Sequence, residues 1–429
     1  MNHEFDVVVV GAGSAGSSAA ISAGRLGART LLVDRMPFLG GTSTAVLDTF
    51  YAFYTPGAHP RRVVGGIGWE VAERLKAVDM AFERPNTYGA GTGVTYDPEV
   101  LKLLWEELAA QAGVEVLLHT WATGVEQHDG RVTGIRVWNK GGESAVQARA
   151  IVDASGDADI CAMAGIAYED AKTTPGVQSL STIFRAANVD VEKASALPKT
   201  ELWAMMRRAA QSGEYRLPRL EGSWHRTPHP GIVTVHMTRI PNVDATDPEQ
   251  LTQAEIEGRR QVREYHRFLR DRVPGFERSV LVATSPAIGV RESRRVIGDY
   301  RLTRDDVLNA RRFDDEIALC GAPIEDHAAA PDTRWTYVPE SGVYGIPFRC
   351  LLPAGVEGLL VAGRCFSATH DAHASARSMA TCMAMGQCAG TAAAMAARAG
   401  CTPRLVEAAA LRASLREGGA LLDPLEPVS

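Results

Sequence analysis

The sequence lacks the features that define several protein classes. It contains only seven cysteines in 429 residues, and no two of them form a CxxC or CxxxxC pair. This spacing excludes a zinc ribbon, a cysteine-ligated iron–sulfur cluster and a redox-active dithiol, and it predicts free thiols in a reducing compartment. No apolar run approaches the roughly 18 residues of a membrane span. The start, MNHEFDVVVVGAG, has no basic segment before its apolar run, so we expect no signal peptide and a cytoplasmic location.

The chain also lacks an excess of positive charge. It has 45 Lys and Arg residues against 51 Asp and Glu residues, which gives a net charge of −6. This balance argues against a nucleic-acid or anionic-membrane partner. Hydrophobic residues make up 45% and charged residues 22% of the chain, as expected of a globular protein. At roughly 150 residues per domain, the length predicts two or three domains with a large core.

Glycine, in contrast, is abundant, with 41 residues that occur mostly among alanines. The first cluster, 11–16, follows a β-branched run at 5–10 that is typical of a strand buried on both faces. An alanine-rich segment at 17–27 is predicted to be a helix, and 29–33 a second buried strand. Together these segments predict a βαβ unit with parallel strands.

The glycine cluster reads Gly11-Ala-Gly13-Ser-Ala-Gly16, and its context makes it a dinucleotide-binding turn. Gly11 allows the sharp turn, Gly13 lets the backbone approach a pyrophosphate, and Gly16 permits close contact between helix and strand. The helix N-terminus offers free N–H groups to the phosphates. Asp34 ends the second strand, 18 residues after Gly16, where a carboxylate can accept hydrogen bonds from a ribose.

Further glycine turns distinguish FAD from NAD as the ligand. A second pair, Gly40-Gly41, follows Asp34. The predicted strand at 151–157 ends in a turn at Gly156, and the predicted strand at 358–362 ends just before Gly363. No second GxGxxG follows a strand, so we expect no NAD(P)H domain. The glycine-rich segment 89–93 lacks both a preceding strand and the third glycine, and it is predicted to be a loop.

This set of motifs resembles the FAD-binding oxidoreductases of the glutathione-reductase-like class with two dinucleotide folds. It is most similar to the succinate dehydrogenase/fumarate reductase-like branch, and within it to the bacterial FAD-dependent oxidoreductase family. The matching runs include 289–303, 345–353, 362–370 and 377–391. The resemblance covers most of the chain, but it does not extend to the residues from about 170 to 285.

The resemblance implies FAD as the cofactor and no metal. It places the N-terminus of a helix that follows Arg377 at the flavin ring, where it stabilises negative charge on the reduced ring. The cofactor-binding residues that it implies are Gly11, Gly13, Ser14, Ala15, Gly16, Asp34, Arg35, Gly40, Gly41, Thr42, Ser43, Ala122, Ala154, Ser155, Gly156, Gly363, Arg364, Met379 and Cys382.

The chemistry expected at this site is hydride exchange between a small organic substrate and flavin N5, as in a dehydrogenase or oxidase. A disulfide reductase is excluded because no cysteine follows Gly41 at the dithiol position. His370 and His373 are the candidate acid–base residues, and Arg377 is a candidate anchor for a flavin or substrate oxygen. The alternatives are a flavin-dependent C=C reductase, a monooxygenase and an electron-transfer subunit. The external electron acceptor or donor is left open.

Three further features have two readings each. The charged run at 291–295 predicts internal ion pairs or a clamp for a substrate anion. The run Glu325-Asp-His327 is predicted either to border the active site or to lie away from it. Tyr51 is predicted either to line a substrate pocket or to pack in the core. The alternatives stay open at the level of sequence.

The predicted fold class is α/β: a Rossmann-like FAD-binding domain with an inserted α+β substrate domain. We assign 1–45, 95–165 and 346–429 to the FAD-binding domain, and 46–94 and 166–345 to the substrate domain. Predicted helices include 69–78, 97–112, 248–272 and 379–399, and predicted strands include 114–119, 123–128, 131–139, 145–153, 233–240 and 280–290. A homo-oligomer is compatible with the sequence.

Overall fold

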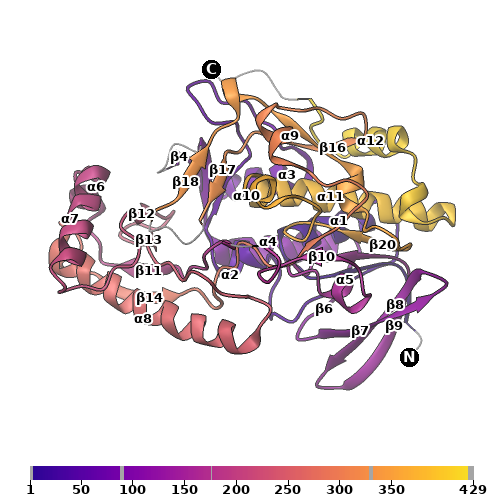
Figure 1. Cartoon of the computed structure of the whole chain (residues 1–429), viewed down its shortest axis with the longest axis horizontal. Helices are drawn as coiled ribbons and strands as arrows, with labels where there is room; N and C mark the ends of the chain where they lie inside the picture. The colour runs from indigo at the N-terminus through magenta and orange to yellow at the C-terminus, as the bar shows by residue number, and fades with distance from the viewer. Residues whose placement is uncertain (1–2, 87–90, 175, 328–331, 424–429) are drawn as a thin grey trace.

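A seven-stranded sheet forms the centre of the molecule (Figure 1). The structure is a computed structural model that describes residues 3–86, 91–174, 176–327 and 332–423. The strand order is β6 (Glu115–Leu117), β2 (Thr30–Val33), β1 (His3–Val10), β9 (Gly142–Asp153), β8 (Arg131–Asn139) and β7 (Trp121–His128), with β20 (Leu359–Val361) also paired to β9. Strands β6, β2, β1, β9 and β20 are parallel, whereas β7, β8 and β9 form an antiparallel meander. This is the Rossmann-like α/β fold that the sequence predicts.

The central strand β1 is buried on both faces, which explains its continuous run of valines. Val7 and Val9 belong to the larger core, on the face covered by helices α1 (Ser14–Arg25) and α11 (Met379–Ala399). Val8 and Val10 face the other side, toward α5 (Asp159–Met163) and the meander. Helices α3 (Gly66–Ala77) and α4 (Pro98–Gln111) complete the first face.

Helices α1 and α11 cross at very short distance through small residues. A Cβ added at Gly386 would lie 2.0 Å from the carbonyl oxygen of Ala15, and one added at Gly390 would lie 2.0 Å from that of Ala19. Only a glycine is compatible with these two positions, because the obstructing atoms belong to the backbone.

A separate lobe, at the left of Figure 1, contains a four-stranded antiparallel sheet. Its order is β12 (Ser223–Arg226), β13 (Val233–His236), β11 (Phe184–Ala187) and β14 (Val280–Thr284). The helices of this lobe are α6 (Val191–Ser195), α7 (Lys199–Gln211) and α8 (Pro248–Arg272). The lobe has its own core, which runs from Phe184 to Phe276 in sequence.

Smaller elements connect the two parts. The short sheets are β3 (Thr49–Phe50) with β5 (Thr92–Tyr96) and β4 (Ala81–Pro85), β10 (Tyr168–Glu169) with β15 (Arg295–Val296), β16 (Glu316–Cys320) with β19 (Tyr344–Pro347), and β17 (Ile324–Asp326) with β18 (Arg334–Thr336). The remaining α-helices are α2 (Thr42–Ala45), α9 (Arg304–Leu308), α10 (His370–Ala376) and α12 (Ala408–Glu417).

Several predicted elements differ from the structure. The predicted strand 280–290 ends at Thr284, because Pro286 cannot donate to a ladder, and the predicted strand 233–240 ends at His236. The core does not follow the predicted domain boundary at 46–94, because Phe50 and Val71 pack in the larger core with β1. Of the predicted loop 89–93, residues 89 and 90 lie outside the described part, and Thr92 already begins β5.

Two classes of feature are not found in the part of the chain that the structure describes. None of its helices is both long enough and apolar enough to cross a membrane. No group of three or more His, Cys, Asp or Glu side chains is arranged there to hold a metal ion.

Candidate active site

One cleft runs from the glycine turn after β1 to the N-terminus of α11. It brings together most of the residues that the sequence predicts to form the site. Those that line it are Gly11, Gly13, Ser14, Ala15, Asp34, Arg35, Gly41, Thr42, Ala154, Ser155, Gly156, Gly363, Arg364, Arg377, Met379 and Cys382. These residues come from four segments that are far apart in sequence, so the cleft is a product of the tertiary fold.

Six of the predicted site residues do not line this cleft: Gly16, Gly40, Ser43, Ala122, His370 and His373. Gly16 and Gly40 do not line the cleft, but they allow the backbone of the two turns to pack closely. A Cβ at Gly16 would lie 1.7 Å from the oxygen of Gly11, and the Gly40 N–H donates to the oxygen of Ala12 at 2.7 Å. Ser43 donates its hydroxyl to Gly40 at 2.8 Å, and Ala122 packs against the core on the other face of the sheet.

The first end of the cleft fits the pyrophosphate of FAD. Helix α1 begins at Ser14 with Gly13 as its N-cap, and no side chain caps its free N–H groups. The hydroxyl of Ser14 is buried without a hydrogen-bond partner among the described residues. No protein atom lies within 4 Å of the position where Gly13 would carry a Cβ. Free donors, a positive helix end and open space are the requirements of a phosphate cradle.

Asp34 and Arg35 form the ribose side of this end. One carboxylate oxygen of Asp34 accepts from the Ala12 N–H at 2.5 Å and the other from the Met36 N–H at 2.7 Å. Burial raises the pKa of Asp34, and the hydrogen bonds from Met36 and Ala12 oppose that effect. Each carboxylate oxygen has a second lone pair, so Asp34 can still accept from a ribose hydroxyl.

The other end of the cleft fits the flavin ring. Helix α11 extends over 21 residues from Met379, and its N-cap, Ser378, makes no side-chain capping bond. Both residues line the cleft. Arg377 lies beside them and donates from Nη2 to the carbonyl oxygen of Glu325 at 3.2 Å. Its Nε is buried without a hydrogen-bond partner in the described part of the chain. These donors are suited to a group that carries negative charge.

Between the two ends, Arg364 is neutralised by a carboxylate. Its Nη2 lies 3.0 Å from Oδ1 of Asp157, and Ser293 donates its hydroxyl to the same oxygen at 2.6 Å. Burial would raise the pKa of Asp157, but Arg364 and these hydrogen bonds lower it below the usual value. A Cβ at Gly156 would lie 2.7 Å from Arg364 Nη2, so the glycine makes room for the guanidinium.

The cleft also contains a polar pocket that the sequence did not fully predict. Tyr51, Ser181, His236, Arg291 and Glu325 line it. Arg291 donates from Nη1 to the Ser181 hydroxyl at 2.9 Å and from Nη2 to Nε2 of His236 at 3.0 Å. Sequence reasoning left Tyr51, Arg291 and Glu325 open and missed His236. The available signal was a single histidine that ends the short strand β13.

Burial and charge set the ionisation of this pocket. Burial, together with Arg219 and Arg291, lowers the pKa of His236 well below its ordinary value, so the imidazole is neutral. Because Arg291 donates to Nε2, the ring proton lies on Nδ1. Burial opposes the ionisation of Glu325, but His327, at 2.8 Å, and Arg377 lower the pKa of Glu325 to about 2.

The two histidines predicted for acid–base work point elsewhere. Nδ1 of His370 lies 2.9 Å from Oε2 of Glu292. Burial opposes its protonation, but Asp326 and Glu292 raise the pKa of His370 to about 9. His373 is fully buried and donates from Nε2 to the oxygen of Arg364 at 2.8 Å. Burial lowers the pKa of His373 to about 3.

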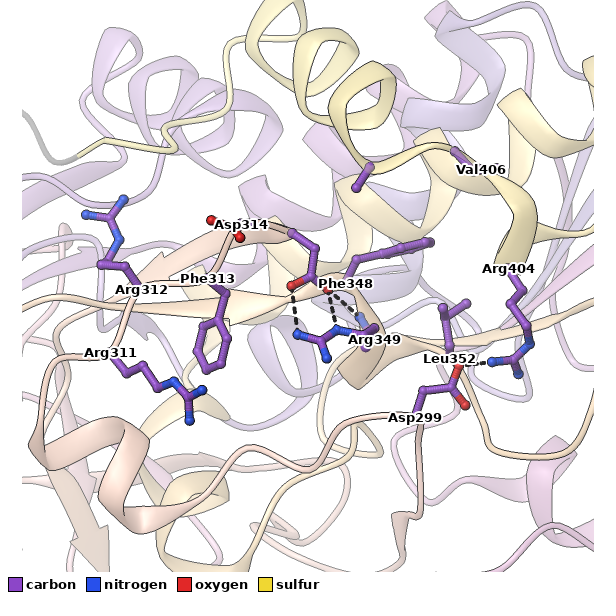
Figure 2. Close-up of a pocket in the computed structure, with 12 residues that line it drawn as sticks. Asp299, Arg311, Arg312, Phe313, Asp314, Phe348, Arg349, Leu352, Arg404 and Val406 are labelled. Carbon is purple, nitrogen blue, oxygen red and sulfur yellow. Dashed lines mark hydrogen bonds and ion pairs between the residues drawn. The ribbon is translucent and has the colours of Figure 1, made fainter.

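A second pocket, shown in Figure 2, lies on the surface between the 299–315 segment, the 348–352 segment and the start of the C-terminal segment. Its arginines already have carboxylate partners. Arg349 Nε lies 2.9 Å from Asp315, Arg311 Nη1 lies 2.9 Å from Asp306, and Arg404 pairs with Asp299. The remaining arginine of the lining, Arg312, pairs with Glu316, so each of the four arginines has a carboxylate partner.

Comparisons with known proteins bear on the family and the fold of the chain. A family profile described as FAD dependent oxidoreductase matches residues 6–415. A digeranylgeranylglycerophospholipid reductase from Thermoplasma volcanium is 26% identical over 204 residues, which cover 44% of this chain and 48% of that protein. The protein of the same name from Methanocella arvoryzae is 30% identical over 169 residues, which cover 36% and 40%. The chain therefore matches less than half the length of these curated relatives.

A solved structure extends the likeness of fold over nearly the whole chain. A triple mutant of a flavin-dependent brominase superposes with a TM-score of 0.50 at 12% identity, over 96% of this chain and 84% of that one. At this identity the likeness concerns the fold alone.

Proposed function

Because this chain belongs to the FAD-dependent oxidoreductase family, we propose that it exchanges a hydride between a small organic substrate and flavin N5, as a dehydrogenase or oxidase. The observation that carries the proposal is the continuity of the cleft. A single cavity contains the glycine turn at Gly13, the N-terminus of α11 at Met379 and the polar pocket around Arg291. A substrate in that pocket lies beside the flavin end of the cofactor site.

Each end of the cleft has a separate task. The FAD that the family binds supplies a two-electron acceptor or donor. The N-terminus of α1 and the Ser14 hydroxyl hold the phosphates, and Asp34 holds a ribose. The N-terminus of α11 and Arg377 favour negative charge at the ring end of the cleft.

The proton that accompanies hydride transfer needs a partner on the cleft wall. His236 and Tyr51 line the pocket, and we assign the acid–base role to His236 because a neutral imidazole can accept a proton. Burial raises the pKa of Tyr51, so its hydroxyl stays protonated and can orient a substrate oxygen. For His370 and His373 the same role stays a sequence-based prediction without a contact to the cleft.

A second candidate function is the reverse reaction, in which a flavin reduced by an external donor reduces the substrate. The names of the curated relatives, which are reductases, favour this direction. The motifs that resemble the succinate dehydrogenase/fumarate reductase-like branch favour it as well, and that finer placement stays a prediction.

The test is an anaerobic screen that follows the visible absorbance of the flavin in the purified holoenzyme. A dehydrogenase or oxidase substrate bleaches the oxidised flavin saturably, and an added acceptor restores the colour. If no compound bleaches the flavin and an unsaturated compound reoxidises the pre-reduced enzyme, the reductase direction is correct. If neither occurs, hydride exchange with a small substrate is wrong.

His236→Gln provides a variant that tests the assigned base. The substitution keeps a polar side chain but removes the proton-accepting nitrogen, so the bleaching rate should fall by about 100-fold. FAD content should stay at one per chain, because His236 belongs to the polar pocket and not to the phosphate cradle. An unchanged bleaching rate would exclude His236 as the base.

A further inference from the structure

The polar pocket has more positive than negative charge. Arg291 and Arg377 both line the cleft, and Glu325 is the one carboxylate lining that end among the described residues. Arg291 donates to the carbonyl oxygen of Ser179 at 2.7 Å, to the Ser181 hydroxyl and to His236, and all three of these acceptors are uncharged. In the described part of the chain, Arg291 therefore makes no ion pair within 4.0 Å.

The second guanidinium is also incompletely satisfied. Arg377 donates to a carbonyl oxygen, and its Nε is buried without a hydrogen-bond partner among the described residues. A buried donor of this kind costs free energy unless a ligand satisfies it. The excess charge also affects Arg291, because burial and the neighbouring Arg377 lower the pKa of Arg291 to about 9. Elsewhere in the cleft, Arg364 has its own carboxylate, Asp157, at 3.0 Å.

The wall next to this charged pair is apolar. Residues that follow α2, precede β11 and follow β14 contribute apolar side chains to the same cleft. They are Val46, Leu47, Ile183, Ala287, Ile288 and Val290. The pocket therefore offers one strongly cationic end and one hydrophobic side, and its ideal ligand has the complementary distribution.

We propose that the substrate of this oxidoreductase is an organic acid with an apolar body, and that its carboxylate binds between Arg291 and Arg377. The inference rests on the proposed function in that the ligand is called a substrate. The binding site rests on the hydrogen bonds of Arg291, on the unpartnered Nε of Arg377 and on the presence of both residues in the lining of the cleft. A planar guanidinium binds a carboxylate through two parallel hydrogen bonds, and a lysine does not reproduce that geometry.

The anion has a consequence for His236. When a carboxylate takes the Nη2 donor of Arg291, Nε2 of His236 loses its 3.0 Å hydrogen bond and its lone pair becomes available. The added negative charge also offsets the arginines that lower the pKa of His236. The imidazole thus becomes a stronger base when the acid is bound.

The experiment titrates the oxidised holoenzyme with benzoate and propionate, and in parallel with benzamide and propionamide. The amides have nearly the same shape without the charge. Binding is measured by the change in the flavin absorption spectrum and by the shift in thermal unfolding midpoint. We expect saturable binding of at least one carboxylate and at least tenfold weaker binding of its amide. Equal binding of acid and amide, or no binding of either acid, overturns the proposal.

Arg291→Met should weaken carboxylate binding at least tenfold while FAD stays bound, and Arg291→Lys should restore part of the affinity. The matched control is Arg349→Met in the surface pocket of Figure 2, which removes an arginine paired with Asp315 and should leave carboxylate binding unchanged. If Arg291→Met does not fold, the lysine variant must still bind carboxylates more weakly than the wild type. Unchanged binding in either Arg291 variant overturns the assignment.

The failure of this inference is distinguishable from the failure of the proposed function. A holoenzyme that is bleached only by neutral compounds and ignores carboxylates keeps the proposed function and loses the inference. A holoenzyme that binds carboxylates through Arg291 but exchanges no hydride keeps the carboxylate site and loses the proposed function.

Discussion

At the scale of single residues, His370 takes part in an ion pair and does not line the cleft. It begins α10, and its ring contacts Glu292, which also forms an ion pair with Arg295, whose Nε lies 2.9 Å from Oε1 of Glu292. Arg295 in turn pairs with Glu169 at 3.0 Å. Within the run at 291–295, Glu292 and Arg295 form the internal ion pairs that the sequence predicts. Arg291 lines the cleft, and its part in a clamp for a substrate anion stays a prediction.

This pair predicts a stability that depends on pH. The pKa of His370 is raised to about 9 in the fold, against about 6.5 in an unfolded chain. Its contribution is therefore fully present below about pH 6.5 and is lost as the pH rises toward about 9. The loss is on the order of 3 to 4 kcal/mol, since the shift is about 2.5 pKa units and one unit corresponds to about 1.4 kcal/mol.

Urea unfolding of the wild type and of His370→Gln at about pH 6 and about pH 9.5 measures this effect. The variant should be less stable at the lower pH and should lose much less stability between the two values. His128→Gln is the control, because the side chain of His128 is 83% exposed. A His370→Gln variant that keeps the full wild-type pH dependence would contradict the role given to the ion pair.

At the scale of elements, the turn between β1 and α1 separates two uses of glycine. A Cβ at Gly16 would meet the Gly11 oxygen at 1.7 Å, whereas a Cβ at Gly13 would meet no protein atom within 4 Å. Gly16 is therefore required by the fold. An alanine at position 13 would clash with none of the described neighbouring residues. The absence of a side chain at Gly13 therefore leaves space for the cofactor.

The two alanine variants should separate accordingly. Gly13→Ala should change the stability of the apoprotein by no more than about 1 kcal/mol, the scale of an N-cap substitution, but weaken FAD binding at least about tenfold because the methyl group occupies the phosphate position. Gly16→Ala should destabilise the apoprotein by roughly 3 kcal/mol or more, because backbone atoms obstruct the added carbon. Calorimetric FAD titration and urea unfolding measure the two effects. Wild-type FAD affinity in Gly13→Ala would contradict the placement of the phosphates.

Local signals predicted the best-defined elements. Helix α8 begins at Pro248 after the N-cap Asp247, as the sequence indicates. Capping residues and proline at the first turn act within a few positions, so they can be recognised without knowledge of the fold. Asp129 and Gly130, with φ of 49° and 75°, form the hairpin turn between β7 and β8, and an Asp-Gly pair is itself a local signal for such a turn.

At the scale of the whole molecule, the cleft is lined by residues of the larger core and by residues of the second lobe. The larger core includes β1, α1 and α11, and the second contains α7, α8 and the four-stranded sheet. The cofactor half of the cleft belongs to the first core, and Ser181, Ile183 and His236 reach it from the second lobe. Binding of FAD should therefore stabilise the two parts unequally.

Hydrogen exchange of the holoprotein and apoprotein tests this division. Removal of FAD should increase exchange at least about tenfold at the start of α1 and of α11, because ligand binding adds to the opening free energy of the elements that contact it. In α7 and α8 the change should stay below about twofold. An equal increase throughout the chain would mean that the two cores open as one unit.

The cofactor half of the site could be predicted from the sequence, and the substrate half could not. The FAD half depends on a turn whose glycines lie close together in sequence. The polar pocket joins His236, Arg291 and Glu325 from three segments, and no spacing connects them. The acid–base role of His370 and His373 stays a prediction: both precede α11 in sequence, and their rings contact Glu292 and the oxygen of Arg364.

The contact of Gly386 and Gly390 with Ala15 and Ala19 has a consequence for the choice of cofactor. Helix α1 presents its N-terminus to one end of the cleft and α11 presents its own to the other. Because the two helices are interlocked backbone to backbone, the separation of their N-termini is set by the protein before any ligand arrives. The fixed separation of the two helix N-termini thus favours a ligand of a given length. A mononucleotide can bind at one N-terminus, whereas a dinucleotide can reach both.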